Sequence, residues 1–186
     1  MNLTEVLTHD GKEIKKQEEI TMDVLSMPDG HYPITQKSPV DLTVINRGDK
    51  VLDIKCIGSL HVLVPCARCL TDVPVTIDID LDEAVDMSDP QAPTLLTSGE
   101  ENEQDRFHAL ETIDFIHGYQ LDVDALVKGE ALLNWPSQVL CREDCKGLCR
   151  ICGQNLNLRT CGCESAELDP RMAKIRDIFR LASREE

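Results

Sequence analysis

Apolar and polar residues alternate most regularly in the segment VPVTIDIDL, at positions 73–81. Every second residue from Val75 to Leu81 is aliphatic, and the residues between them are Thr or Asp. A period of two residues is typical of a strand with one buried and one solvated face. The segment therefore predicts a half-buried β-strand.

The chain before this strand carries further β signals. Residues 42–66, LTVINRGDKVLDIKCIGSLHVLVPC, predict a strand, a turn around Gly48 and a longer strand pair. Leu52, Ile54 and Cys56 share one face there, so we interpret Cys56 as a small core residue rather than a metal ligand. Strands joined by short turns predict an antiparallel meander or barrel-like sheet over residues 1–81.

Two further segments follow the predicted sheet. Residues 82–110 are acidic and contain two prolines and a glycine, which favours a solvated linker. Residues 111–140 predict a short strand and a helix that packs on the β domain. This helix, over about 122–134, begins at Asp122 as its N-cap and ends before Pro136.

The last segment, residues 141–186, is rich in cysteine and ends in a predicted helix. Asp169 and Pro170 suit the N-cap and first position of that helix. We therefore expect an α+β fold: an N-terminal antiparallel sheet, short helices, a zinc-ribbon-like segment and a terminal helix.

Composition narrows the class of function. The chain has 186 residues, 41 % of them hydrophobic, and a net charge of −15. Such an acidic protein repels nucleic-acid backbones unless a local basic patch overrides the global field. Aromatic residues are only 3 %, which argues against a base-stacking platform. No segment approaches the roughly 20 apolar residues of a membrane span, and we expect a cytoplasmic protein with reduced thiols.

Nine cysteines carry the clearest chemical signal. Six of them fall within residues 141–163, CREDCKGLCRICGQNLNLRTCGC. Eight of the nine form close pairs: Cys66 and Cys69, Cys141 and Cys145, Cys149 and Cys152, Cys161 and Cys163. A structural zinc ion takes four ligands, usually in a tetrahedron. Six local cysteines are two too many for one ion, whereas four pairs suit two Zn²⁺ ions.

Loop length favours one way of dividing the pairs. Cys149 and Cys152 can join Cys161 and Cys163 across an eight-residue loop, which leaves the pairs at 66–69 and 141–145 to form a second site. The second site joins the β segment to the C-terminal segment. Two alternatives remain: one zinc on four of the six local cysteines, or a two-zinc cluster with bridging thiolates.

The number of cysteines in each predicted site bears on whether the metal could be catalytic. Four thiolates fill the zinc shell, whereas a catalytic zinc keeps an open position, so we expect structural sites and no enzyme activity. A redox C-x-x-C at Cys66 and Cys69 is the rival interpretation. No βαβ pattern surrounds that pair, which disfavours it.

The predicted terminal helix is basic within an acidic chain. Four of its residues are candidates for RNA contact: Arg171, Lys174, Arg176 and Arg180. Solvated side chains, or compensation of thiolate charge, are the more ordinary interpretation of such residues.

Three segments resemble the YceD family of large ribosomal RNA subunit accumulation proteins. They are PCARCL, LDVDALVKGEALLNWP and LCREDCKGLCRICGQNLNLRTCGCESAELDPRM. The resemblance covers roughly residues 40–182. It implies a non-enzymatic role in the accumulation of 23S ribosomal RNA and in large-subunit assembly, in the bacterial cytoplasm or in plastids.

Two hypotheses about the partner follow. In the first, an assembly factor binds ribosomal RNA through the cysteine-rich segment and the terminal helix. In the second, an acidic module binds a basic ribosomal protein and affects RNA indirectly. The net charge of −15 favours the second, and the basic C-terminal stretch keeps the first open. A zinc-stabilised scaffold with another partner is a third possibility.

Overall fold

The computed structural model describes residues 1–96 and 113–163. The chain divides into two compact units. Of the described residues, unit 1 comprises 1–64, 72–96 and 113–139, and unit 2 comprises 65–71 and 140–163. Two separated stretches of sequence therefore build unit 2, and the first of them is the loop between two long strands of the sheet.

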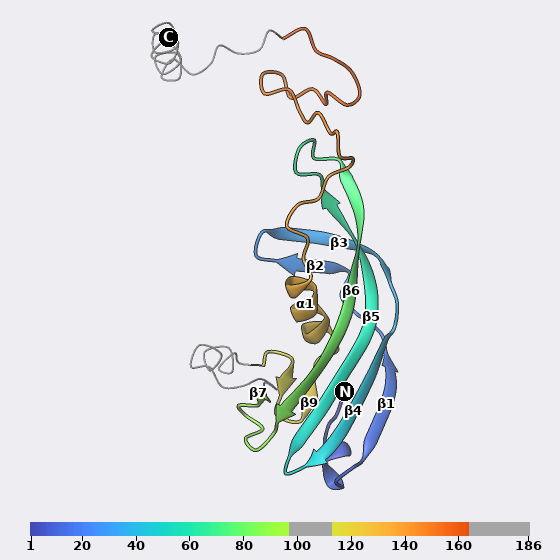
Figure 1. Cartoon of the computed structure of the whole chain (residues 1–186), viewed down its shortest axis with the longest axis vertical. Coiled ribbons are helices and arrows are strands. Elements are labelled where there is room, and N and C mark those ends of the chain that lie inside the picture. The colour runs from blue at the N-terminus through green and yellow to red at the C-terminus, as the bar shows by residue number, and fades with distance from the viewer. Residues whose placement is uncertain (97–112, 164–186) are drawn as a thin grey trace, which may run out of the picture. The chain divides into compact units, whose positions relative to one another are not determined.

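Strands dominate unit 1, and most of them are antiparallel (Figure 1). In chain order the elements are η1 (Val6–Thr8), β1 (Glu13–Glu18), β2 (Val24–Met27), β3 (Gly30–Lys37), β4 (Val40–Gly48), β5 (Val51–Pro65), β6 (Asp72–Asp86), β7 (Thr94–Leu96), β8 (Ile116–His117), β9 (Gln120–Leu121) and α1 (Val123–Leu133). With one helix against a largely antiparallel sheet, the described residues confirm the predicted α+β class.

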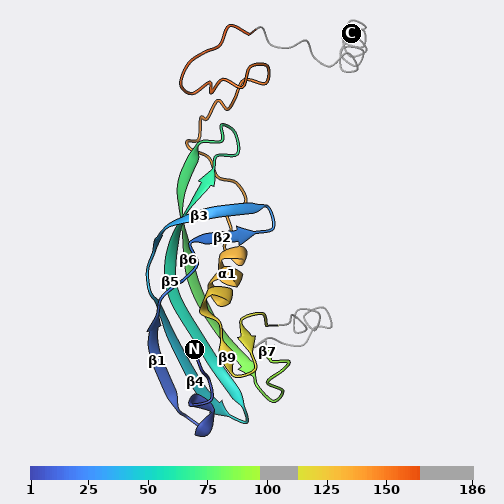
Figure 2. The same ribbon diagram turned by 180° about the vertical axis from the view of Figure 1, so that it is seen from behind.

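The long strand β5 organises the sheet. Its first part pairs with β4, from Val51 to Ile57, and its later part pairs with β3, around Leu60 and Val62. The strand β6 lies along its other side, as the views in Figures 1 and 2 agree. The strand pair predicted after the turn is thus one continuous strand that changes its partner midway.

Gly58 occupies the point where β5 changes partner. A Cβ atom there would lie 2.6 Å from Cγ1 of Val40, the first residue of β4. Real Cβ atoms do not approach that closely, so a side chain at position 58 would displace β4. Glycine therefore lets β4 start against β5 at this point.

The turn between β4 and β5 is short and has a left-handed backbone. Asp49 and Lys50 have φ angles of +50° and +63°. Two successive positive φ angles match the twist of the flanking strands in a two-residue hairpin turn. The turn predicted around Gly48 is confirmed at this position.

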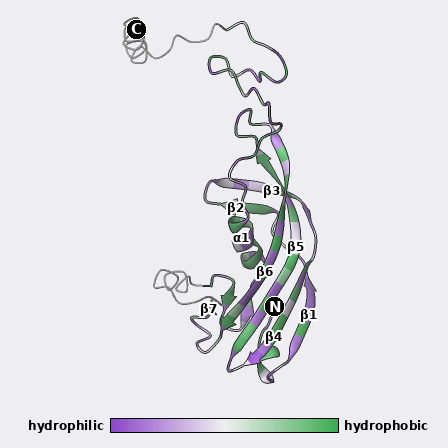
Figure 3. Ribbon diagram, viewed as in Figure 1, coloured by the Kyte–Doolittle hydropathy of each residue, from purple (hydrophilic) through white to green (hydrophobic). Residues whose placement is uncertain are grey.

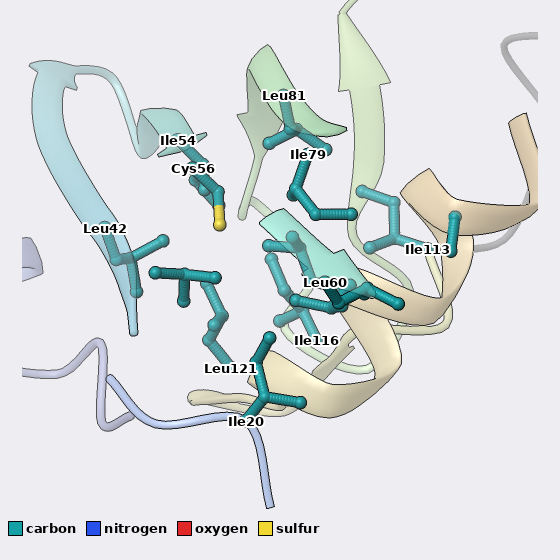
Figure 4. Packing of buried hydrophobic residues seen from close by; sticks show 14 of the residues in the cluster. Ile20, Leu42, Ile54, Cys56, Leu60, Ile79, Leu81, Ile113, Ile116 and Leu121 are labelled. Carbon is teal, nitrogen blue, oxygen red and sulfur yellow. The ribbon is translucent and has the colours of Figure 1, made fainter. Parts of the chain in front are cut away.

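The core of unit 1 lies between the sheet and α1. Along β5 and β6 hydrophobic and hydrophilic residues alternate, as Figure 3 shows, and the apolar side is buried. Cys56 is fully buried among Leu42, Ile54 and Leu60 (Figure 4). Burial raises the pKa of its thiol to about 11, with further increases from Glu130 and Asp41. Cys56 is a core residue, as predicted.

Helix α1 covers the core next to β6 and β2, as Figures 1 and 2 show. Its N-cap is Asp122, whose side chain accepts a hydrogen bond of 3.1 Å from the backbone N–H of Ala125. Leu126, Val127 and Ala131 are buried on its inner face. Both the cap and the extent of the helix agree with the sequence prediction.

The structure differs from the predicted linker over residues 82–110. Strand β6 continues to Asp86, and β7 pairs with its last residues. Val85 and Met87 are buried, while acidic neighbours occupy the solvated side, so composition alone made a strand resemble a linker. Residues 97–110 of that prediction lie outside the described residues.

Two other predictions concern short segments. The single strand expected before α1 is instead a hairpin of β8 and β9, which turns at Gly118 with φ of +61°. The predicted terminal helix lies outside the described residues. No helix in residues 1–96 or 113–163 is both long and apolar enough to cross a membrane.

Candidate metal centres

Four cysteines in unit 2 form the first cluster, which we call site 1. Its members are Cys66, Cys69, Cys141 and Cys145. All four sulfur atoms lie within 4.8 Å of one another. The Sγ atoms of Cys66 and Cys145 are 3.8 Å apart, and those of Cys69 and Cys141 are 3.5 Å apart. Two pairs separated by more than seventy residues therefore converge on one point.

A tight turn aims the first pair at this point. The backbone N–H of Leu70 donates to the carbonyl oxygen of Cys66 at 3.0 Å, and the N–H of Cys66 donates to the carbonyl of Thr71 at 2.8 Å. Leu70 has a positive φ of 59°. The chain thus reverses between β5 and β6 and presents the sulfurs of Cys66 and Cys69 together.

Backbone contacts hold the second pair against that turn. The side chain of Arg68 donates to the carbonyl oxygen of Cys145 at 3.1 Å. The backbone N–H of Leu148 donates to the carbonyl oxygen of Arg68 at 3.2 Å. Gly147 has φ of +75°, and a Cβ atom there would lie 3.0 Å from that same Arg68 oxygen. Glycine thus permits the close approach of the two segments.

The remaining four cysteines of unit 2 form site 2. Its members are Cys149, Cys152, Cys161 and Cys163, again with all sulfurs within 4.8 Å of one another. The N–H of Gly153 donates to the carbonyl of Cys149 at 2.9 Å, and the N–H of Ile151 approaches the Cys149 sulfur at 3.4 Å. Gly153 lies in the left-handed region at φ of +71°, and a tight C-x-x-C-G turn of this kind is typical of zinc-binding knuckles.

The sulfur spacing fits a tetrahedral dication better than a disulfide. A tetrahedron with Zn–S distances of ~2.3 Å has sulfur–sulfur edges of ~3.8 Å, whereas a disulfide bond measures ~2.05 Å. The 3.8 and 3.5 Å separations in site 1 lie near the first value. All nine cysteines are free thiols. Both sites are therefore compatible with zinc on geometry and on donor type.

Electrostatics in site 1 favour a cation. Burial acts to raise the pKa of Cys66, but backbone N–H donors outweigh it and lower that pKa to about 6. Cys141 behaves in the opposite way: its contact with the Cys69 sulfur, followed by burial, raises its pKa to about 12. Four clustered thiols cannot all ionise without a cation, because adjacent thiolates repel each other. A dication would let all four ionise.

Site 2 shows the same division. Backbone N–H groups of Cys152 and Ile151 lower the pKa of Cys149 to about 6. Contact with the Cys152 sulfur raises the pKa of Cys163 to about 12. In both sites the pKa of one thiol is lowered and the pKa of another is raised.

A side chain from the loop of site 2 supports site 1. The Nδ2 atom of Asn157 lies 3.2 Å from the Cys145 sulfur and donates to it. Its Oδ1 atom accepts from the backbone N–H of Lys146 at 2.8 Å and from Arg142 at 2.7 Å. Sequence reasoning did not identify Asn157, because nothing in its local context distinguishes it from an ordinary loop asparagine.

The eight predicted ligands fall into the two predicted groups. Cys141 and Cys145 join Cys66 and Cys69, which leaves four of the six local cysteines for site 2. The two groups share no member, unlike the alternatives of a single zinc or a bridged cluster. The four candidates for RNA contact lie outside the described residues: Arg171, Lys174, Arg176 and Arg180.

Comparison with known families gives one match. Residues 54–179 match the family model described as "Large ribosomal RNA subunit accumulation protein YceD". The matched region contains all eight cysteines of sites 1 and 2. No curated protein and no solved structure matches the chain.

Proposed function

The chain belongs to the YceD family, since the family model matches more than half of its length, and from this premise we propose a non-enzymatic zinc-binding factor that supports 23S ribosomal RNA accumulation and large-subunit assembly. The family description supports the link to ribosomal RNA. We expect a cytoplasmic location, where thiols remain reduced and available to metal.

The pair of four-cysteine sites carries this proposal. Each site would hold one Zn²⁺ through four thiolates, which leaves no position for water or substrate. A saturated shell supplies structural stability rather than Lewis-acid chemistry. The redox alternative for Cys66 and Cys69 is less well supported, because two further sulfurs complete their group and a strand rather than a helix follows them.

The described part of unit 2 carries an excess of basic residues. Five are basic (Arg68, Arg142, Lys146, Arg150, Arg159) and two are acidic (Glu143, Asp144). A Zn²⁺ ion with four thiolates has a net charge of −2, so two filled sites would offset the positive charge of these residues. Direct contact with RNA phosphates therefore depends on the basic residues beyond position 163.

A second candidate function rests on the solvated face of β6. Asp78, Asp80 and Asp82 all point to solvent along this strand, and of these Asp82 pairs with Lys55 at 3.0 Å. An acidic row suits a basic ribosomal protein, which long-range attraction would steer toward it. In that case the chain acts on ribosomal RNA indirectly.

Complementation tests the proposed function. Cells that lack the protein would receive the parent chain, Cys66→Ser/Cys69→Ser, Cys149→Ser/Cys152→Ser or Cys56→Ala. We expect the parent and Cys56→Ala to restore the ratio of 23S to 16S ribosomal RNA, and both site variants to fail. Full restoration by both site variants would contradict a zinc-dependent role.

Charge variants distinguish direct binding of RNA from binding of a basic ribosomal protein. Changing Arg171, Lys174, Arg176 and Arg180 to Glu should abolish RNA retention if the chain binds RNA directly. Changing Asp78, Asp80 and Asp82 to Asn should instead abolish binding of a basic ribosomal protein if the acidic face is the contact. The salt dependence of binding should follow whichever set of charges is responsible.

A further inference from the structure

The loop that connects the two halves of site 2 also supports site 1. Residues 153–160 run from Cys152 to Cys161, so metal at site 2 fixes both ends of this loop. Three sets of contacts lead from the loop to the ligands of site 1. All of them lie within unit 2.

The first set is made by Asn157. Its amide nitrogen donates to the Cys145 sulfur at 3.2 Å, which partly neutralises charge on that thiolate. Its amide oxygen accepts from Lys146 and Arg142, the neighbours of Cys145 and Cys141 in sequence. One side chain thus contacts a ligand sulfur and orients the turn that carries two ligands.

The second set passes through Asn155. Its Oδ1 atom accepts from the backbone N–H of Asn157 at 2.9 Å, which fixes the loop conformation. Its Nδ2 atom lies 3.4 Å from the hydroxyl of Thr71. That hydroxyl lies 3.3 Å from the sulfur of Cys69, another ligand of site 1.

The third set is a short three-segment layer. Leu148 forms an antiparallel bridge with Asn155, and the N–H of Leu156 donates to the carbonyl of Gly147 at 2.9 Å. On its other side, Leu148 donates to the carbonyl of Arg68. The segment 147–148 therefore lies between the loop of site 2 and the turn that carries Cys66 and Cys69.

We infer that Asn157 couples the two cysteine sites, so that metal at site 2 raises the metal affinity of site 1. Metal at site 2 holds the loop in the conformation that places the amide against Cys145. Without it the loop must be ordered when site 1 binds, which lowers the affinity of site 1. The coupling is reciprocal, because linkage applies equally to both ions. This inference rests on the proposed zinc binding.

The test measures each site separately in the full-length chain. Zinc-loaded protein is equilibrated with a graded series of zinc chelator and then alkylated briefly. Peptide mass spectrometry reports protection of Cys141 and Cys145 for site 1, and of Cys149 and Cys152 for site 2. The parent is compared with Cys161→Ser/Cys163→Ser, which disrupts site 2 alone.

Asn157→Ala is measured in both backgrounds, as a double-mutant cycle. With site 2 intact, it should weaken site 1 by about 10-fold, the lower end for loss of a group that orients a ligand. Disrupting site 2 should weaken site 1 by a similar factor. In that background Asn157→Ala should add less than about 2-fold, since the loop no longer positions the amide.

Two further variants keep the test specific. Asn157→Asp has the same shape and keeps the acceptor oxygen, but it faces the Cys145 sulfur with a carboxylate oxygen in place of an N–H. It should weaken site 1 at least as much as Asn157→Ala. Gln154→Ala changes the same loop at a side chain that contacts Arg159 and the backbone carbonyl of Asn155 but no atom of site 1, so site 1 should be unchanged.

Some results would overturn the coupling between the sites, and another would overturn zinc binding itself. Site 1 retaining its affinity when site 2 is disrupted would overturn the coupling. Equal losses from Asn157→Ala in both backgrounds would also overturn it, as would equal effects of Gln154→Ala and Asn157→Ala. A parent chain that binds no zinc would remove the proposed zinc binding as well, whereas two zincs without these effects would remove only the inference.

Discussion

The two units bury different kinds of side chain. Unit 1 buries a continuous cluster of aliphatic residues from its strands and helix. In the described part of unit 2 the buried residues are only Cys66, Cys69, Cys145 and Gly147. Three large apolar residues of unit 2 are instead exposed: Leu70 at 65 %, Ile151 at 55 % and Leu158 at 81 %. Unit 1 has an apolar core, and sulfur atoms occupy the equivalent place in unit 2.

This difference determines what stabilises each unit. Each large side chain buried in unit 1 contributes about 1.5–3 kcal/mol by leaving water. Unit 2 has almost no such contribution, and small folds of this kind usually depend on metal or disulfides. Binding of a structural zinc ion supplies roughly 10–16 kcal/mol in small metal-dependent domains, most of which becomes folding free energy.

Metal removal should produce the largest difference in stability between the two units. An excess of zinc chelator should unfold unit 2 and leave unit 1 intact. Hydrogen exchange with mass spectrometry should show loss of protection at Cys149, Gly153 and Leu156, whose N–H groups donate to backbone carbonyls. Amides of β5 that pair with β4 should stay protected. Continued protection in unit 2 without metal would contradict the comparison.

A cavity in the apolar core should have the opposite effect: it should destabilise unit 1 and leave unit 2 unchanged. Ile54→Ala removes a fully buried side chain of β5 and should destabilise unit 1 by about 2–5 kcal/mol. Thermal unfolding should show a lower melting temperature, while zinc content remains unchanged. Ile57→Ala is the matched control, because Ile57 lies on the same strand and is 47 % exposed. Similar losses for both variants would contradict this account of the core.

A methyl group at Gly147 should weaken metal binding at site 1 by disturbing the contact with Arg68. Gly147→Ala and Gly153→Ala impose the same left-handed strain, roughly 1–2 kcal/mol. Only Gly147 also meets the Arg68 carbonyl, since the space around Gly153 is open. Chelator titration with alkylation should show that Gly147→Ala weakens site 1 by about tenfold more than Gly153→Ala weakens site 2. Equal effects would show that the close approach is unimportant.

Glu130 should give the smallest effect, confined to unit 1. Burial, and then the charges of Glu83 and Asp80, raise the pKa of this carboxyl on α1. The folded state therefore holds the proton more tightly than the unfolded state. Its contribution to stability is present below the ordinary pKa of 4.5 and is lost as pH rises through the folded value.

Glu130→Gln should consequently raise the melting temperature of unit 1 at neutral pH, by about 1–2 °C. The gain should disappear below pH 4.5, where the carboxyl of the parent is protonated. Glu143→Gln, an exposed change in unit 2, serves as the control. A gain that persists at low pH would contradict burial of the charge as the cause.

Local patterns predicted local structure well. The alternation in β6 and the Asp122 cap of α1 depend on neighbours in sequence, and both predictions are confirmed. The grouping of the cysteines followed from the four ligands that zinc requires together with the short loop between Cys152 and Cys161. The extension of β6 through Asp86 was missed, because its pairing with β7 decides the structure there and its acidic side resembles a linker.

Contacts between distant segments were beyond local patterns. The change of partner along β5 at Gly58 depends on where β4 begins. The contact of Asn157 with Cys145 depends on how the loop of site 2 folds back on site 1. Neither has a period or spacing that a sequence could display.

Zinc content per chain shows whether unit 2 holds one metal ion in each of its two cysteine sites. Elemental analysis of protein purified without chelator should give two zincs for the parent and for Cys56→Ala, whose sulfur lies in the apolar core. It should give one zinc for Cys66→Ser/Cys69→Ser. One zinc in both the parent and this double variant would contradict a metal at site 1, and no zinc in any of them would contradict the account of unit 2.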